Sequence, residues 1–557
     1  MKKLLYIPLI AAAFIFQSCG EEFLDSKNLY EKLDVDYYKT PQDITEALTA
    51  VYSCLATDAG NQNMTLMANI LSDDCLGGGG QADYLFHDLD RFATEAGENQ
   101  FKECWETAYR GIFRANMIIY RFDQAEYKDE VERNQALGEA YFLRAYFYMK
   151  LGQFFGNVPL ITKPEPVNYP KASADEIFGQ VASDFKKAIE LMAPTKFQNI
   201  PVERLGHATK WAAQGMMARA FLFYTGKYNK TEISLPEGGS VTKDQVVAWL
   251  DDCIANSGHG LLSDFRNQWP YAYAGEHYPY AKNNNLQWVG EEGGNNETVF
   301  AVKYSPYGNF NPAGVLSYCN QLVLYCALRE QPSLIPWGNG WGAGPVNPLL
   351  WQSFEDNDVR KKGSIIDITD PEEGDVSEEY IWGGQNANGV EETGFAQKKY
   401  TPITIPHPET GAVVSMFYIL YGGQNNMQLW SMQDEILLRF PDILLMAAEL
   451  GSANAQTYFD RVRTRAGLAS KPVSLDAIKL ERRHELAFEG VRWFDLLRWH
   501  EEEAALTAVK NFNVKNIGIE EPYTGIYRSE TNGFLPIPES EILLSEGVLE
   551  QNPGWIK

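Results

Sequence analysis

The stretch from Ala136 to Thr162 has the sequence A-L-G-E-A-Y-F-L-R-A-Y-F-Y-M-K-L-G-Q-F-F-G-N-V-P-L-I-T and carries a clear helical pattern. Long side chains recur within it at steps of three and four residues: Leu137, Tyr141, Arg144, Tyr148 and Leu151. Residues with this spacing share one face of an α-helix, so the pattern predicts an amphipathic helix over 134–151.

Helix start signals lie on both sides of this stretch. T-P-Q-D at 40–43 places an N-cap threonine before a proline and predicts a helix to about residue 55. S-A-D-E at 173–176 has the form of a capping box and predicts a helix that ends before Pro194. Further helices are predicted over 101–122, 209–224, 435–450, 453–466 and 476–498.

The predicted helix over 209–224 is rich in small residues, which let a neighbouring helix approach closely: Ala212, Ala213, Gly215, Ala218 and Ala220. Paired helices with such contacts predict tetratricopeptide-like hairpins, degenerate rather than matching the strict repeat. Between residues 265 and 433, glycine, asparagine, proline and aromatic residues dominate, with short alternating runs such as 298–302. The predicted fold is therefore mainly α, a tetratricopeptide-like helical-pair scaffold with a large loop-rich insertion containing short strands.

This pattern divides the mature chain into three parts. We expect an N-terminal helical scaffold over 38–264, a loop-rich insertion over 265–433 and a C-terminal helical segment over 434–557. Long loops inside a folded protein are usually functional, so the insertion is expected to bind a ligand. The helices on either side of the insertion are expected to pack together.

The N-terminus predicts export and lipid attachment. Lys2 and Lys3 precede an apolar run of roughly 13 residues, which is too short to span a membrane and fits a signal peptide over 1–18. Cys19 follows small and polar residues and precedes Gly20, as in bacterial lipoproteins. We expect Cys19 to be acylated and 19–37 to form a tether. The alternative is a secreted protein cleaved elsewhere, in which Cys19 is incidental.

The net charge of −26 argues against nucleic acid as a partner, because the phosphate backbone favours Lys and Arg. The six cysteines after Cys19 form no C-x-x-C pair, which disfavours a zinc or thioredoxin-like site, and we expect free buried thiols. The acidic runs 356–358 and 372–375 do not follow the EF-hand pattern. No metal or cofactor is expected.

Six segments of the chain carry a family resemblance. They are the stretch 136–162 quoted above, G-H-A-T-K-W-A-A-Q-G-M-M-A-R-A-F-L-F-Y-T-G-K-Y (206–228), L-R-F-P-D-I-L-L-M-A-A-E (438–449), E-R-R-H-E-L-A-F-E-G-V-R-W-F-D-L (481–496), F-L-P-I-P (534–538) and Q-N-P-G-W (551–555). In this order they resemble the SusD-like (RagB/SusD) family of Bacteroidetes outer-membrane lipoproteins.

The resemblance implies four tetratricopeptide-like units that support a variable, loop-rich half. It implies surface binding of oligosaccharide or polysaccharide without catalysis, and delivery to a SusC-like TonB-dependent transporter on which the protein sits as a lid. It also implies a surface-exposed lipoprotein of the outer membrane, and Glu21-Glu22 after Cys19 resembles the export signal of such proteins. Two alternatives stay open: a binder of peptides or glycopeptides, and a surface glycoside hydrolase.

A sugar site needs aromatic side chains for the C–H faces and polar side chains for the hydroxyl groups. The resemblance places part of the site in the loop after Ser72-Asp73-Asp74, which makes Tyr84 and Phe86 candidates. In the insertion, four further aromatic residues are candidates on composition alone, because glycine and asparagine surround them: Trp288, Tyr307, Trp337 and Trp341. Any single aromatic residue is more often part of a core than of a binding surface.

Two other motifs are interpreted as structural. Charged residues alternate at helical spacing between 481 and 492, which permits pairs within the helix and pairs to a neighbour. We expect them to tie the late helices to the earlier bundle. His484-Glu485 lacks the second histidine of a zinc protease. The glycine-rich run 338–344 follows a proline-tryptophan pair rather than a strand, so we interpret it as a loop and not as a nucleotide site.

Overall fold

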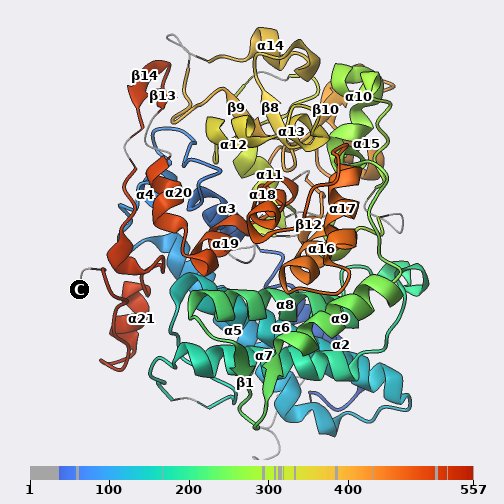
Figure 1. The fold of residues 1–557 in the computed structure, drawn as a ribbon, viewed down its shortest axis with the longest axis vertical. Helices are drawn as coiled ribbons and strands as arrows, with labels where there is room; N and C mark the ends of the chain where they lie inside the picture. Colours follow the sequence, from blue (N-terminus) through green and yellow to red (C-terminus); the bar gives the residue numbers. More distant parts are fainter. Residues whose placement is uncertain are drawn as a thin grey trace, which may run out of the picture.

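Three layers follow one another down the long axis in Figure 1, with the N-terminal helices at one end and the insertion at the other. The computed structural model describes residues 37–57, 60, 62–165, 167–290, 295–306, 309–310, 316–317, 319–331, 334–382, 387–429, 431–508, 512–523 and 525–555. Cys19, the predicted signal peptide and the predicted tether up to residue 36 lie outside these residues. The helices within 440–499 lie between the other two layers.

Each long helix of the scaffold packs on the next one along the chain. They are α2 (Pro41–Tyr52), α5 (Asn99–Arg121), α6 (Glu130–Phe155), α7 (Ala174–Leu191), α8 (Lys210–Lys227) and α9 (Lys243–Asn256). Thr40 and Ser173 both form complete capping boxes, as their sequences predict. Two short helices, α3 (Asn63–Ile70) and α4 (Tyr84–Asp90), come between α2 and α5. The mainly helical, tetratricopeptide-like scaffold is thus confirmed.

The insertion consists of short helices and two-stranded sheets. The helices are α10 (Pro279–Asn283), α11 (Gln321–Cys326), α12 (Pro348–Ser353), α13 (Val359–Ser364), α14 (Val376–Glu379) and α15 (Met416–Tyr421). The paired strands are β4 (Asn309–Phe310) with β5 (Leu316–Ser317), β6 (Leu328–Arg329) with β7 (Asn339–Gly340), β8 (Ile365–Asp367) with β9 (Phe395–Gln397), and β10 (Thr404–Pro406) with β11 (Val413–Ser415). The predicted strand over 298–302 is β3 (Thr298–Val302).

Two helix predictions near the C-terminus are wrong in part. Residues 435–439 form strand β12 (Glu435–Arg439), which pairs antiparallel with β3, and helix α16 (Phe440–Glu449) begins only after it. The predicted helix over 476–498 is two helices, α18 (Leu475–Glu485) and α19 (Arg492–Trp499). The chain turns between them at Phe488 and Gly490, which have φ of 68° and 69°. The predicted helix over 453–466 agrees with α17 (Ala455–Arg465).

The remaining elements cover the edges of the scaffold and of the C-terminal segment. A hairpin of β1 (Glu232–Ser234) and β2 (Ser240–Thr242) precedes α9, and α20 (Glu502–Ala508), β13 (Asn513–Asn516), β14 (Ile519–Pro522) and α21 (Glu539–Leu544) end the chain. The six cysteines after Cys19 are buried thiols outside any disulfide of the described residues, as expected. Across the described residues, every helix is too short or too polar to cross a bilayer.

A network of buried ion pairs joins the insertion to the C-terminal segment, and its centre is Arg439 at the end of β12. This guanidinium is fully buried and contacts Glu297, Glu485 and Glu489 at 2.7, 2.8 and 2.6 Å. Glu297 precedes β3, Glu485 ends α18, and Glu489 lies in the turn before α19. Arg439 therefore holds the segment before β3 against the C-terminal helices.

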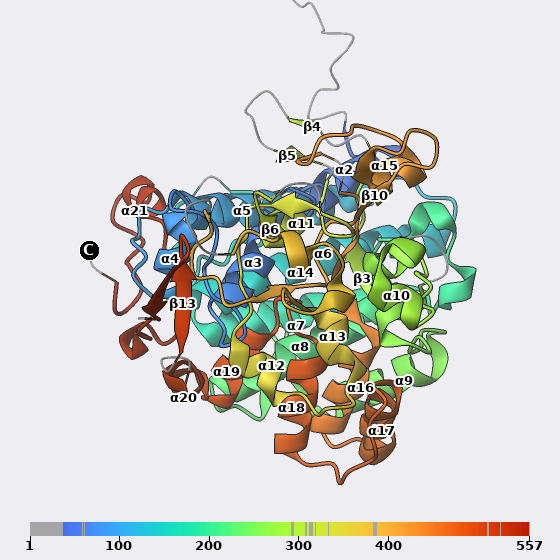
Figure 2. The same ribbon diagram turned by 90° about the horizontal axis from the view of Figure 1, so that it is seen from above.

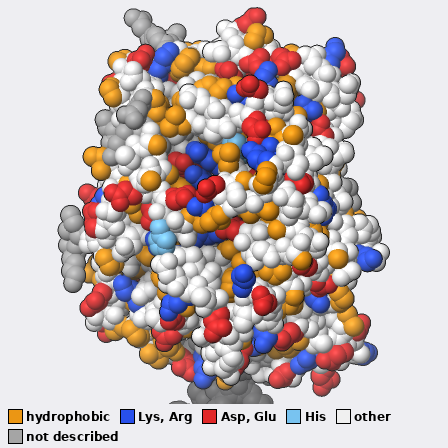
Figure 3. All heavy atoms as spheres, in the orientation of Figure 1, with side chains coloured by type: hydrophobic (Ala, Val, Ile, Leu, Met, Phe, Trp, Pro, Cys, Tyr) orange, Lys and Arg blue, Asp and Glu red, His pale blue; other side chains and the backbone are white. Residues whose placement is uncertain are grey.

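The charged residues between 481 and 492 mostly form ion pairs with residues elsewhere in the fold, which is the second of the two arrangements that their spacing permits. Arg483 contacts Asp74 at 2.6 Å and Arg492 contacts Asp73 at 2.8 Å, which ties the C-terminal helices to the segment after α3. This confirms the expected link to the earlier bundle. Figure 3 shows basic and acidic side chains gathered in a hollow near the middle of the face on which α18 lies.

Asp442 of α16 predicts how stability depends on pH. Burial alone raises the pKa of Asp442, but the guanidinium groups of Arg219 and Arg482 outweigh burial and lower it from 3.8 to about 2. A carboxyl group with a depressed pKa stabilises the fold above its unfolded pKa, and that contribution disappears as the pH falls from about 4 to 2. We expect this one group to account for about 2 kcal/mol of the free energy of unfolding lost over that range.

Urea unfolding between pH 5 and pH 2 tests this expectation on the unmodified protein and Asp442→Asn. The variant should be less stable at pH 5 and should lose less stability on acidification. Asp123→Asn is the control, because Asp123 is a surface partner of Arg133 with 93% of its side chain exposed. Equal losses in Asp442→Asn and the unmodified protein would contradict the assignment.

Candidate ligand-binding site

Two glycine runs position the start of the candidate site by pairing with each other. Gly79 N donates to Gly342 O at 2.8 Å, and Gly344 N donates to Gly77 O at 3.0 Å. A side chain at Gly78 would place its Cβ 2.2 Å from the ring of Pro345. The two runs are therefore a close backbone contact that fixes the chain just before α4. The run 338–344, interpreted as a loop, is a loop apart from Asn339 and Gly340, which form β7.

Arg329 of β6 links α4 to the segment that carries Trp341. Its Nη1 lies 3.2 Å from Asp83 Oδ2 and donates to Trp341 O at 3.2 Å. Asp83 directly precedes α4, and its Oδ2 also accepts from Gly80 N at 2.8 Å. Because the same carboxylate meets both the glycine run and Arg329, the first turn of α4 is held beside the loop of Trp341.

Two of the predicted site residues, Phe86 and Trp341, both contact Tyr325 at this place, and Tyr84 begins the helix that carries Phe86. We call these four residues the α4 aromatic group: Tyr84, Phe86, Tyr325 and Trp341. The ring of Phe86 lies 6.0 Å from that of Tyr325, which lies 5.0 Å from that of Trp341, both edge-on. Tyr84 is 57% exposed and Trp341 is partly buried, whereas Phe86 is 6% exposed. Tyr84 and Trp341 can therefore contact a ligand directly. Phe86 is buried and packs against Tyr325.

Trp288 belongs to a second cluster, the α15 aromatic group. Its ring is edge-on to Tyr273 at 6.2 Å and to Phe417 at 6.0 Å, and Phe417 stacks on Tyr421. Trp288 is partly buried, so only part of its ring is accessible. Figures 1 and 2 both place α11 between α4 and α15, so the two aromatic groups lie on opposite sides of α11.

Trp337 does not belong to an exposed platform, and its prediction as an accessible site residue is wrong. Its side chain is fully buried, and its Nε1 donates to Glu373 O at 2.9 Å. The rings of Tyr278 and Trp337 are 5.2 Å apart, and Lys398 Nζ lies 5.6 Å from the Trp337 ring centre. Trp337 is thus a core residue that packs around a buried ion pair of Lys398 and Glu373. Tyr307 lies outside the described residues.

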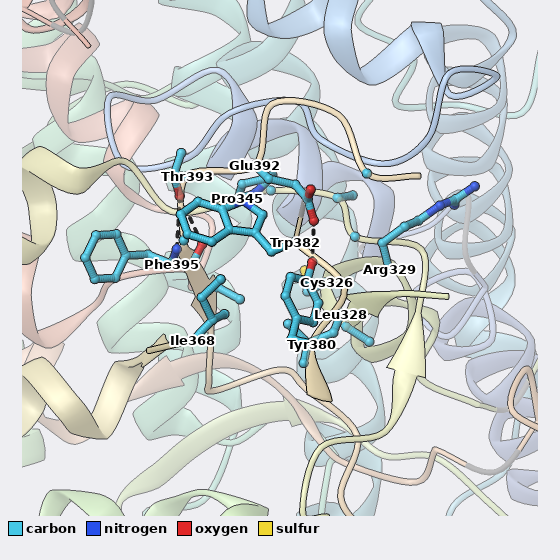
Figure 4. Close-up of a pocket in the computed structure, with 17 residues that line it drawn as sticks. Cys326, Leu328, Arg329, Pro345, Ile368, Tyr380, Trp382, Glu392, Thr393 and Phe395 are labelled. Carbon is cyan, nitrogen blue, oxygen red and sulfur yellow. Dashed lines mark hydrogen bonds between the residues drawn. The ribbon is translucent and has the colours of Figure 1, made fainter. Parts of the chain in front are cut away.

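A narrow crevice opens beside the α4 aromatic group, and Arg329 and Gly342 form one side of it. Figure 4 shows its lining, in which Leu328, Ile368 and Phe395 supply apolar surface. Tyr380 OH donates to Glu392 Oε1 across the crevice, as Figure 4 also shows.

The charged residues that line the crevice are Arg329 and Glu392, and Lys515 lies next to the lining residue Trp382. Burial raises the pKa of Glu392, and the hydrogen bond from Tyr380 and the positive charge of Lys515 only partly oppose it. Lys515 Nζ stacks 3.6 Å from the ring centre of Trp382, which also lines the crevice. Composition alone points to Trp382, since it lies in an aromatic and amide-rich stretch. Tyr325, Arg329 and Glu392 carry no such signal in the sequence.

The crevice is poorly equipped for glycoside hydrolysis. That reaction uses two carboxyl groups on either side of the scissile bond, whereas Glu392 is the one acidic residue among the described residues that line the crevice. Within the described part of the chain, three or more His, Cys, Asp or Glu side chains nowhere gather in a way that would hold a metal ion. The arrangement suits binding through stacking and hydrogen bonds.

Comparison with known protein families gives two matches that together span most of the chain. The profile described as "SusD family" matches residues 291–555, and the profile described as "Starch-binding associating with outer membrane" matches residues 22–222. A SusD-like protein of Bacteroides ovatus is 22% identical over 523 aligned residues, which cover 88% of this chain and 81% of the relative.

Solved structures show the same fold. Surface glycan-binding protein A from Bacteroides fluxus superposes with a TM-score of 0.71 at 24% identity, covering 93% of this chain and 100% of that one. Surface glycan-binding protein A from Bacteroides thetaiotaomicron in complex with laminarihexaose superposes with a TM-score of 0.69 at 22% identity, covering 92% and 99%.

Proposed function

Since this chain belongs to the SusD family, we propose that it binds oligosaccharides and polysaccharides at the cell surface, without cleaving them, and delivers them to a SusC-like TonB-dependent transporter. In this proposal Cys19 carries the lipid that holds the protein on the outer membrane, and 19–37 is the tether. The insertion over 265–433 supplies most of the binding surface, and the helical parts over 38–264 and 434–557 support it.

The observation that carries the proposal is the α4 aromatic group. Tyr84 and Trp341 offer accessible ring surface, and Asp83 and Arg329 lie directly beside them. Aromatic rings stack on the C–H faces of sugars, while carboxylate and guanidinium groups bond to hydroxyl groups. Aromatic and polar groups side by side are what a sugar-binding surface requires.

Affinity gel electrophoresis of the purified protein in a panel of neutral and acidic polysaccharides tests the binding step. Retardation by at least one glycan, without release of reducing ends, is the expected result. Laminarihexaose is the first oligosaccharide to measure by calorimetry, because a structural relative was solved with it. Release of reducing ends would favour a hydrolase, and retention of peptide mixtures without any glycan would favour the peptide-binding alternative.

Delivery and anchoring need a separate experiment in the native bacterium. Affinity purification of the full chain from solubilised outer membranes is expected to recover a TonB-dependent transporter. Protease treatment of intact cells is expected to digest the protein, because the proposal places it on the outer face. Protection from protease would contradict surface exposure, and recovery without a transporter would contradict delivery.

Replacement of Tyr84 or Trp341 by Ala should weaken glycan binding while leaving the fold intact. Loss of one stacked ring costs about 1 kcal/mol, which is roughly a fivefold weaker Kd for each variant. Tyr120→Ala is the matched control, because Tyr120 is 68% exposed on α5 and lies outside the α4 aromatic group. Calorimetric titration of the three variants measures the effect. Unchanged affinity in Tyr84→Ala and Trp341→Ala would show that the α4 aromatic group is not part of the binding site.

A further inference from the structure

An open groove lies along α5, beside the point where the described part of the chain begins. Phe113, Met117 and Tyr120 of α5 line it, and Tyr38 lines it as well. The three α5 residues are four and three positions apart, so they share one face of the helix. Phe113 is 55% exposed and Tyr120 is 68% exposed, so both rings are accessible to a bound segment.

The groove is formed before anything binds to it. Residues 163–165 also line it, and the chain just before them is fixed to the scaffold helices. Asn116 Nδ2 of α5 donates to Ile161 O at 2.8 Å, and Tyr148 OH of α6 donates to the same oxygen at 2.9 Å. A preformed surface binds a segment without a further cost for ordering the surface itself.

The start of the described chain is held beside this groove. Tyr38 is 9% exposed and has φ of 69°, a conformation that a residue with a side chain adopts only where the surroundings hold it. The capping box of α2 fixes the next residues, since Asp43 Oδ2 accepts from Thr40 N at 2.9 Å. An extended chain advances at most about 3.4 Å per residue, so residues 33–36 lie within about 17 Å of Tyr38.

The sequence of the segment 31–36, E-K-L-D-V-D, has the pattern of an extended strand with one apolar face. Leu33 and Val35 alternate with Asp34 and Asp36. In an extended conformation the two apolar side chains therefore point to one side and the two carboxylates to the other. Four extended residues span about 13 Å, which matches the rise of about 11 Å over two turns of α5.

The charges of the groove and of this segment are opposite in sign. Arg121 and Lys163 line the groove together with a single carboxylate, that of Glu165. The segment 31–36 carries three carboxyl groups and one ammonium group. Its attachment to Tyr38 also gives it an effective concentration in the roughly millimolar range, which a second copy of the chain does not reach in dilute solution.

We propose that the groove on α5 binds residues 31–36 of the same chain in an extended conformation. Leu33 and Val35 pack on the exposed rings of α5, and the carboxylates on the other side of the segment face the two cations of the groove. This docking does not depend on glycan binding. Its consequence for anchoring rests on the proposed function: the lipid-bearing end then meets the scaffold at α5, and only 19–30 remains as a free tether.

Limited trypsin digestion of the mature chain with Cys19→Ser tests the proposal, because this chain carries the whole segment without acyl chains. Trypsin cuts after Lys27, which precedes the segment, and after Lys32, which lies within it. Intact-mass spectrometry gives the ratio of the two cutting rates. A docked segment is cut only while it is out of the groove, so the ratio reports docking.

The ratio is compared in three variants of this chain. The groove variant combines Phe113→Ser with Tyr120→Ser, and Val35→Asp changes the segment instead of the groove. The control combines Leu543→Ser with Leu544→Ser, because these leucines of α21 are 73% and 71% exposed and lie outside the groove. Synthetic peptides of residues 24–40, with and without Val35→Asp, correct for any direct effect of that substitution on trypsin.

We expect cutting after Lys32, relative to Lys27, to be at least about fivefold faster in the groove variant than in the chain that carries only Cys19→Ser. Val35→Asp should give a similar increase, and the α21 control should give none. The folded body by itself hinders a protease that acts near Tyr38, so the comparison between variants is decisive. Val35→Asp leaves every residue of the folded body unchanged, so it remains informative if the groove variant fails to fold.

Equal ratios in the Cys19→Ser chain, the folded groove variant and Val35→Asp would overturn the proposal. Sedimentation of the same samples identifies the alternative occupant. Dimers of the Cys19→Ser chain that the groove variant abolishes would assign the groove to a second copy and would also overturn the proposal. None of these measurements involves a glycan, so a failure here leaves the proposed glycan-binding function standing.

Discussion

Replacement of Arg439 by Ala is expected to lower the free energy of unfolding by about 3–5 kcal/mol, because it leaves buried carboxylates without their cation. Arg439 is fully buried and bonds to Glu297, Glu485 and Glu489, and its Nη2 also donates to Glu485 O at 2.7 Å. Water cannot replace the guanidinium without opening the junction of β3, β12 and α18. Urea unfolding at neutral pH measures the loss.

Arg133→Ala is the matched control for this experiment. Arg133 pairs with Asp123 and Glu130 at the surface, where ion pairs contribute at most about 1 kcal/mol. A loss of less than about 1 kcal/mol in Arg439→Ala as well would mean that solvent reaches the three carboxylates, and would contradict the role of Arg439 as the centre of the network.

Replacement of Trp337 by Ala is expected to destabilise the fold by about 3–5 kcal/mol, as large-to-small changes of buried aromatic residues do. Trp337 fills the space beside Tyr278 and above the Lys398–Glu373 pair, so the variant leaves a cavity next to two buried charges. Trp337→Phe keeps most of the ring but loses the hydrogen bond to Glu373 O, and is expected to cost less. Thermal and urea unfolding of both variants measure these effects.

Comparison with Trp341→Ala makes this prediction specific. The two tryptophans are four residues apart, yet Trp337 is expected to change stability and Trp341 to change glycan affinity. Trp341→Ala should alter the free energy of unfolding much less than Trp337→Ala. A stable Trp337→Ala variant with weakened glycan binding would reverse this assignment and return Trp337 to the binding surface.

The sequence predicts the scaffold well where the determinants are local. Capping boxes at Thr40 and Ser173 and helical periodicity involve residues within one or two turns of each other, so the pattern alone is sufficient. The errors in predicted secondary structure arise where contacts with residues far away in the sequence determine the local conformation. Residues 435–439 form a strand because β3 offers a partner more than 130 positions earlier in the chain, and a short apolar run does not distinguish strand from helix.

The break between α18 and α19 has the same origin. A Cβ at Gly490 would lie 3.2 Å from Thr65, so the left-handed turn at 488–490 fits a surface contributed by α3, far away in the sequence. Helical spacing of charges on both sides of the break favours one continuous helix, and the sequence holds no local signal of the contact with Thr65.

Trp337 and Trp341 show most clearly that composition alone does not predict which aromatic residues of the candidate site are exposed. Both lie in the same glycine-rich stretch, so composition assigns them the same role. Lys398 and Glu373, which lie 61 and 36 positions after Trp337, bury one of the two rings. Tyr84 and Trp341 were predictable as candidates, whereas the crevice depends on Glu392, which has no neighbouring motif to mark it.

The antiparallel pairing of β3 with β12 has a consequence for how such proteins diversify. Paired strands lie about 4.8 Å apart, so the chain leaves the scaffold after β3 and returns at β12 through almost the same point. The segment 303–434 carries Trp341, Trp382 and Glu392. Its two ends therefore lie side by side on the paired strands. Recombination can exchange its loops for others of different length without altering the register of the helices beneath it, so ligand preference can evolve separately from the helical scaffold.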